Sequence, residues 1–287
     1  CIRDRTVKII SDSTCDLSKD LLEKYDISIL PLHILLGETE YRDGVDITPE
    51  EIFRWSDENK TTPKTSAPSM TEAMEVMKPF LDEGREIICF SISDSMSTSG
   101  NVMRLAAEEL EASDKVTVIN SANLSTGIGL QVIQAALLSA EGKTRAKITA
   151  AIEEIRPRVR ASFTVDTLTY LYRGGRCNAV AALAGTMLKL HPRIVVEDGA
   201  MDASKKYRGK LSSVILSYTK DMEDDLKNAV PDRVFITHSG CDREIVESVR
   251  SYLESLGIFN EILETRAGGV ISSHCGPGTL GVLFIEK

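Results

Sequence analysis

The sequence predicts an α/β fold of two domains, an N-terminal domain over residues 1–160 and a C-terminal domain over residues 161–287. In the first part, apolar β-branched segments alternate with amphipathic helical segments, which is the pattern of a parallel sheet with helices on both faces. After about residue 160 the alternation gives way to strands, turns and helices in mixed order, which predicts an α+β domain. A chain of 287 residues is long enough for both.

Strands of the N-terminal domain are expected in apolar segments rich in β-branched residues. These segments are VKII (7–10), ISILPLHILL (27–36, taken as one strand), EIICFSIS (86–93) and KVTVINS (115–121). Helices are expected after SDSTCD and over 48–60, 69–84, 101–113 and 125–142. Because the carboxyl ends of parallel strands meet at one edge of the sheet, the loops at that edge are expected to carry the site.

Residues at two of the helix starts are typical of N-caps. Thr48 precedes Pro49 at the start of the 48–60 helix, and Asp16 or Ser18 can cap the first helix. The 69–84 helix carries methionines at helical spacing, which is more typical of a core than of a ligand surface.

The C-terminal domain is expected to contain a β-hairpin whose turn is EDG (197–199), preceded by an Ala-rich helix that includes AVAALAG (179–185). Its other elements are a helix near 211–227, a strand at 232–240, a helix at 243–257, a strand at 260–268 and a last strand at 280–287.

Composition limits the classes of partner. A net charge of −9 argues against nucleic acid and against anionic membranes, since both need a basic face. No apolar run approaches the roughly 18 to 20 residues that span a bilayer. The first ten residues lack a signal-peptide core, and six cysteines are spread singly through the chain. This pattern predicts a cytoplasmic protein without a disulfide framework.

Four clusters of hydroxyl and acidic residues are not explained by packing. They are SDSTCD (11–16), KTSAPS (64–69), SISDSMSTSG (91–100) and SSHCGPG (272–278), all expected in loops at strand ends. The simplest interpretation is helix capping, but one cap needs only one hydroxyl. Repeated hydroxyls and N–H groups near helix starts can also hold a carboxylate or a phosphate.

Two other chemistries stay open at this point. Ser97 or Ser95 with His274 could form the pair of a serine hydrolase or phosphatase, although no orienting acid stands at a recognisable spacing. Two histidines and two cysteines could supply zinc ligands, although the pairs come from separate loops. These are His238, Cys241, His274 and Cys275. We expect no metal and no cofactor.

SDSTCDL, KTSAPS, LYRGGR and HCGPGTLG, in this order from about Val7 to the C-terminus, resemble the motifs of the DegV family of bacterial fatty acid-binding proteins. The resemblance implies two α/β domains with a long-chain fatty acid such as palmitate buried between them. It also implies a carrier without catalysis of its own, which presents its ligand to a separate fatty acid kinase. The kinase makes an acyl phosphate for phospholipid synthesis.

The same resemblance implies roles for individual residues. Thr65 and Ser97 would hold the carboxylate, with His274 near it, and Ser66, Ser95 and Thr279 would complete the fatty-acid site. The segment MSTSG departs from the family's usual LSGTY, so that Thr98 stands where the family has glycine. Candidate kinase-docking residues lie in two basic segments, which without the resemblance would be taken as a solvated charged face: Arg173, Arg176, Lys205, Lys206, Arg208 and Lys210.

Overall fold

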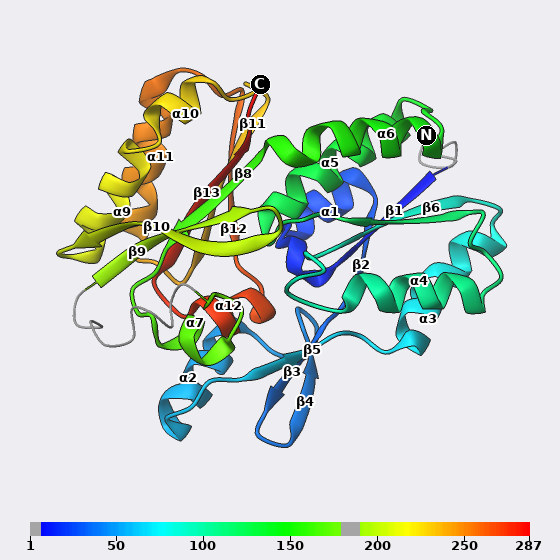
Figure 1. The fold of residues 1–287 in the computed structure, drawn as a ribbon, viewed down its shortest axis with the longest axis horizontal. Coiled ribbons are helices and arrows are strands. Elements are labelled where there is room, and N and C mark those ends of the chain that lie inside the picture. Colours follow the sequence, from blue (N-terminus) through cyan, green and yellow to red (C-terminus); the bar gives the residue numbers. More distant parts are fainter. Residues whose placement is uncertain (1–6, 179–189) are drawn as a thin grey trace.

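The computed structural model describes residues 7–178 and 190–287, which form three sheets with helices packed around them (Figure 1). The expected Ala-rich helix lies outside the described residues. Within the described ranges, no helix is long and apolar enough to cross a membrane.

The first sheet has four parallel strands in the order β2-β1-β6-β7. They are β1 (Val7–Asp12), β2 (Ile27–Leu30), β6 (Glu86–Ser91) and β7 (Val116–Asn120). Ile9 and Ile88 face a core shared with α1 (Lys19–Tyr25), α5 (Thr126–Ala140) and α6 (Arg145–Ile155). Ile10 and Ile87 face α3 (Met70–Asp82) and α4 (Ser99–Glu109) on the other side. The predicted parallel sheet with helices on both faces is confirmed, whereas α6 was not predicted.

The second sheet is mixed, with strand order β10-β9-β8-β13-β11-β12. Its strands are β8 (Val159–Thr164), β9 (Leu190–Glu197), β10 (Ala200–Arg208), β11 (Arg233–Ser239), β12 (Glu261–Arg266) and β13 (Thr279–Ile285). One face is covered by α9 (Leu211–Lys220), α10 (Glu223–Lys227) and α11 (Arg243–Leu256), so the single helix expected near 211–227 is two helices. The other face packs on α5. This sheet begins near the predicted boundary at 160, and the division into two domains stays a prediction.

The β9–β10 hairpin has the predicted EDG turn. Asp198 and Gly199 both have positive φ, 48° and 79°, which matches the right-handed twist of the flanking strands.

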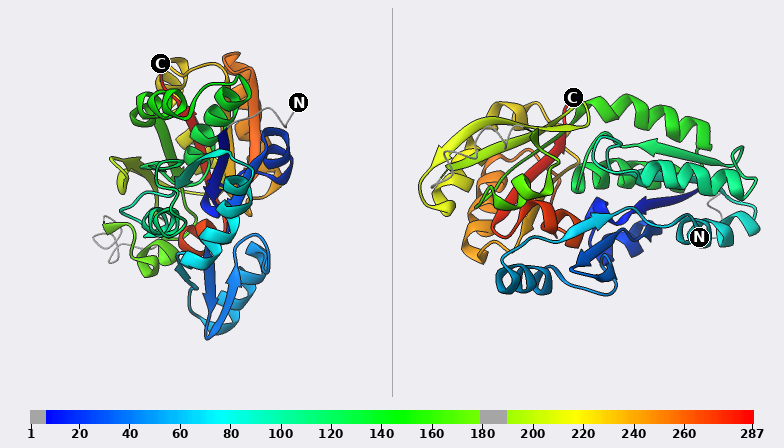
Figure 2. Two further views of the ribbon diagram at one scale, coloured as in Figure 1. Left: turned by 90° about the vertical axis from the view of Figure 1, so that its right-hand side faces the viewer. Right: turned by 60° about the horizontal axis from the view of Figure 1, so that its bottom comes forward.

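A small third sheet, β4-β3-β5, projects away from the two larger ones (Figures 1 and 2). It contains β3 (His33–Leu36), β4 (Thr39–Arg42) and β5 (Lys64–Ser66), and it packs on α2 (Pro49–Asn59). The single strand expected over 27–36 is therefore wrong, because the chain leaves the first sheet after Leu30 and β3 belongs to another sheet. Pro31, which has no N–H for a strand ladder, stands at the break.

Helix starts follow the expected capping chemistry. Thr48 and Glu51 form a capping box at α2, and Ser69 and Glu72 form one at α3. Ser18, and not Asp16, occupies the N-cap position of α1.

His33 joins the small sheet to α3 and generates a prediction about pH. Its Nδ1 lies 2.7 Å from Glu40 and its Nε2 lies 2.8 Å from Glu72. Burial alone would lower the pKa of His33, but the two hydrogen bonds and charges outweigh it and raise the pKa above 6.5. The stability from the charged ring is therefore complete below about pH 6.5 and is lost as pH rises through the folded pKa.

We expect an NMR titration of the His33 ring to give a pKa above 6.5. The thermal midpoint of the parent should fall over that titration more than that of a His33→Gln variant, which cannot be protonated. A His33 pKa at or below the usual value would show that the two carboxylates do not hold the charged ring.

Candidate ligand cavity between the sheets

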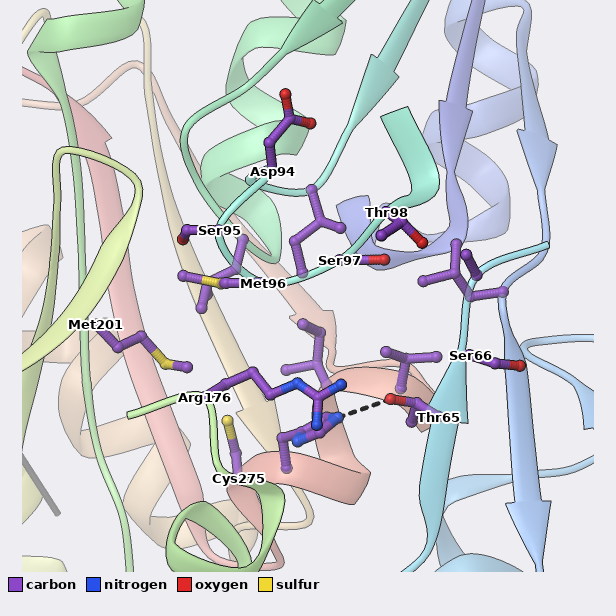
Figure 3. Close-up of a pocket in the computed structure, with 17 residues that line it drawn as sticks. Thr65, Ser66, Asp94, Ser95, Met96, Ser97, Thr98, Arg176, Met201 and Cys275 are labelled. Carbon is purple, nitrogen blue, oxygen red and sulfur yellow. Dashed lines mark hydrogen bonds between the residues drawn. The ribbon is translucent and has the colours of Figure 1, made fainter. Parts of the chain in front are cut away.

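A cavity of about 480 Å³ lies where the loop after β6, strand β5, the β9–β10 hairpin and α12 (Gly269–Cys275) come together (Figure 3). This volume falls within the usual range for small-molecule sites, about 300 to 1,000 Å³. Its lining residues are Leu32, Thr65, Ser66, Ala67, Ile92, Asp94, Ser95, Met96, Ser97, Thr98, Leu124, Arg176, Met201, Val270, Ile271, His274 and Cys275.

One end of the cavity is built around a pair of residues far apart in the sequence. Thr65 Oγ1 lies 2.8 Å from His274 Nε2, which joins β5 to α12. The segment around His274 was expected to be a loop, but Ser272 to Cys275 form the last turn of α12. Gly174 packs against the other side of the ring, where a Cβ would stand 2.4 Å from Nδ1. The first glycine of LYRGGR is therefore needed for close packing.

His274 is neutral near pH 7. Burial of its ring, with the nearby positive charge of Arg176, lowers its pKa to about 4. Among the described residues, its buried Nδ1 has no hydrogen-bond partner. An orphaned N–H is rarer in proteins than a bare acceptor, so we assign the proton to Nε2, which then donates to Thr65. Thr65 keeps its own hydroxyl proton available for an acceptor in the cavity.

The third hydroxyl cluster supplies the facing side of this end. Ser97 and Thr98 line the cavity just before α4, and Ser97 Oγ accepts a hydrogen bond from the N–H of Ser99. Thr98 has a φ of −91°, which any residue adopts. The replacement of the family's glycine by Thr98 therefore creates no backbone strain here.

The other predicted site residues are distributed as follows. Ser66 and Ser95 line the cavity, and Arg176 lies at its mouth, where it is exposed. Thr279 does not line it, because its hydroxyl is buried and donates to the carbonyl of Cys275.

Two predicted docking residues lie outside the cavity lining. Arg173 is exposed and donates to the carbonyl of Lys60, and Arg208 is exposed on β10.

The remaining wall is mainly apolar, and no sequence motif predicted it. Met96 and Met201 come from the loop after β6 and from the hairpin, and Figure 3 shows both on the side of the cavity away from Thr65. Leu124, Ile92 and Ile271 add further apolar surface. Nothing in a local pattern marks Met201, because it becomes a wall residue only through the docking of the hairpin.

The first hydroxyl cluster is structural. Asp12 accepts hydrogen bonds from the N–H of Ile92 and the hydroxyl of Ser99, which ties β1 to β6 and α4. Asp16 accepts from the hydroxyl of Ser125 and the N–H of Gly268 at the start of α12. Burial raises the pKa of both carboxyls.

Asp43, which no sequence motif predicted, also ties separate elements together through hydrogen bonds. It accepts from the N–H of Gly269 and from the hydroxyl of Ser13, and burial raises its pKa. Together with Asp16 it fixes the helix that carries His274.

The arrangement gives little support to hydrolysis. His274 contacts Thr65, and no hydrogen bond joins it to Ser95 or Ser97 among the described residues. A catalytic base also needs a group that orients its second nitrogen, and His274 Nδ1 has none. Within residues 7–178 and 190–287, no three His, Cys, Asp or Glu side chains are grouped as a metal site.

Comparison with known proteins identifies the family of this chain. The family model described as "Uncharacterised protein, DegV family" matches residues 6–287. The chain belongs to the DegV family. A DegV domain-containing protein of Clostridium perfringens is 32% identical over 281 residues, which are 98% of this chain and 99% of the relative.

Two solved structures are similar over nearly the whole chain. A fatty acid-binding DegV family protein from Thermus thermophilus is 31% identical with a TM-score of 0.90, covering 98% of this chain and 100% of that chain. A stearic acid-binding protein from Eubacterium ventriosum is 32% identical with a TM-score of 0.84, covering 98% of both chains.

Proposed function

We propose that this protein is a cytoplasmic carrier that binds a long-chain fatty acid such as palmitate in the cavity between its two domains and presents it to a fatty acid kinase. The observation that carries the proposal is the cavity itself, in which hydroxyls of Thr65 and Ser97 stand at one end and the remaining wall is mainly apolar. The fatty acids named for the two similar DegV-type structures support the same ligand class.

The polar end suits a carboxylate. Thr65 can donate a hydrogen bond to one oxygen while it accepts from His274. Ser97 and Ser66 add hydroxyls, and Arg176 at the mouth adds a positive charge. Each charge-assisted hydrogen bond contributes about 1.5 to 3 kcal/mol when it is shielded from water.

The apolar wall suits the acyl chain and is expected to dominate the affinity. Each methylene removed from water contributes about 0.8 kcal/mol, so a long chain outweighs its head group. The flexible thioethers of Met96 and Met201 allow the wall to adapt to the shape of the chain.

The kinase-docking part of the proposal rests on exposed cations, of which Arg176 lines the cavity while the others lie outside its lining. Arg173, Arg176, Lys206 and Arg208 are all exposed, although the chain has a net charge of −9. Lys205 is not included, because it is paired with Asp221. Exposed cations of this kind would steer an acidic face of the kinase toward the protein.

Native mass spectrometry of protein purified from a bacterial host tests the ligand class. We expect the folded protein to carry the mass of a long-chain fatty acid, and a fluorophosphonate probe to label neither Ser95 nor Ser97. A protein that never carries an acyl chain, whether native or added, would contradict the carrier function. Stoichiometric labelling of one serine would favour the hydrolase instead.

Removal of the head-group hydroxyls is expected to weaken palmitate binding without unfolding the protein. Thr65→Val and Ser97→Ala should each raise the dissociation constant by a factor that corresponds to about 1 to 3 kcal/mol, measured by titration calorimetry. Thr149→Val is the matched control, because its hydroxyl lies on α6 without a partner. If both site variants bound palmitate as the parent does, the carboxylate would have to lie elsewhere.

Arg208→Ala is expected to keep bound fatty acid but to slow acyl-phosphate formation when a bacterial fatty acid kinase and ATP are supplied. Lys115→Ala removes the same charge from an exposed position just before β7, at the amino ends of the first sheet, away from the cavity. Equal turnover by the parent and both variants would show that Arg208 does not dock the kinase. Arg176 is less suitable for this test because it also lines the cavity.

A further inference from the structure

The tip of the β9–β10 hairpin is fastened to the loop after β6 by one backbone carbonyl. The carbonyl of Gly199 accepts hydrogen bonds from the hydroxyls of Ser93, at 2.6 Å, and Ser95, at 2.5 Å. Gly199 has a φ of +79°, and a Cβ there would stand 2.6 Å from Ser93 Oγ. The contact therefore needs glycine at the turn and hydroxyls on the loop.

Both partners in this contact carry walls of the acyl cavity. On the loop, the carbonyl of Ser93 accepts from the N–H groups of Met96 and Ser97, so the place of Ser93 sets the place of Ser97. On the hairpin, Met201 follows Gly199 by two residues and lines the cavity. A displacement of the tip would therefore separate the apolar wall from the carboxylate loop.

Besides the two hydroxyl bonds, the tip lies near Ala122, and there is space beside it. The pairing of β8 with β9 ends at Ala161 and Val196, so the residues beyond have no neighbouring strand on that side. A second hollow of about 810 Å³ borders the tip, and its lining includes Asn123, Arg156, Asp198 and Gly199. Once the two hydroxyl bonds open, this hollow can receive the tip.

We propose that the Gly199 turn is the latch of the acyl cavity and that Ser93 and Ser95 are positioning residues, which fasten the hairpin wall to the carboxylate loop. The ligand leaves when the latch opens. The inference rests on the proposed function for the identity of the ligand. Ser95 lines the cavity and could therefore contact a carboxylate directly. The proposal instead gives Ser95 a role in the latch.

The release rates of two ligands distinguish a role of Ser95 in the latch from direct contact with the carboxylate. Palmitate has a carboxylate, whereas hexadecanol has the same chain length without one. In a Ser93→Ala/Ser95→Ala variant, we expect the dissociation rate constants of both ligands to rise by the same factor, about ten-fold, because two neutral hydrogen bonds are lost. Thr65→Val should speed the release of palmitate far more than that of hexadecanol. Faster release of palmitate alone from the double variant would overturn the latch.

Matched variants distinguish a latch from general loosening. Ser91→Ala removes a buried hydroxyl from the same segment that has no hydrogen-bond partner, and it should leave both rates unchanged. Ser95→Thr keeps a hydroxyl and should restore the slow release that Ser95→Ala loses. If the double variant does not fold, Ser95→Ala alone carries the test, since Ser95 is exposed.

A measurement on the ligand-free protein tests the latch independently of the proposed function. Hydrogen–deuterium exchange at residues 93–97 and 199–203 should quicken together in the double variant, with thermal stability close to that of the parent. Unchanged exchange in both segments would overturn the latch, whatever the protein binds. If the parent binds neither palmitate nor hexadecanol, the carrier function is contradicted. The exchange result would still show whether the latch exists.

Discussion

Three buried carboxylates hold the parts of the cavity in place, and the rest of the site depends on them. A carboxylate removed from water must accept hydrogen bonds, so its donors are fixed relative to it. Asp12 ties β1 to β6 and to the start of α4, Asp16 ties the turn after β1 to α5 and α12, and Asp43 ties the small sheet to α12. The helix with His274 and the loop with Ser97 are thus fixed to one turn, SDSTCD.

Some features of this arrangement could be predicted from the sequence, whereas others depend on contacts between residues far apart in the chain. The parallel sheet, its flanking helices and the EDG hairpin follow from local periodicity and turn chemistry, and these predictions are confirmed. The small sheet was missed because ISILPLHILL is mostly apolar along its whole length, while its division at Pro31 depends on which strands each half meets. Asp43 has no local signal at all, because its partner at Gly269 lies 226 residues away.

Neighbouring residues within one hydroxyl cluster have different roles, and composition alone does not show which residue has which role. Within KTSAPS, Ser69 caps α3 in the way that helix rules predict, while Thr65 lines the cavity. Within SISDSMSTSG, Ser99 bonds Asp12, Ser95 bonds the hairpin and Ser97 lines the cavity. Capping and ligand binding are therefore not competing explanations of a cluster, since neighbouring residues serve each.

The electrostatics of the polar end suit the proposed carrier, which would have to release its ligand. A buried cation would hold a carboxylate strongly, but its release would leave an uncompensated buried charge, at a cost of about 3 to 5 kcal/mol. Here the buried partner, His274, is neutral because its pKa is lowered to about 4, and the nearest cation, Arg176, is exposed to water. In the proposed carrier, neutral hydroxyls would orient the head group while the apolar wall supplies affinity, so opening of the wall would most strongly control exchange of the ligand.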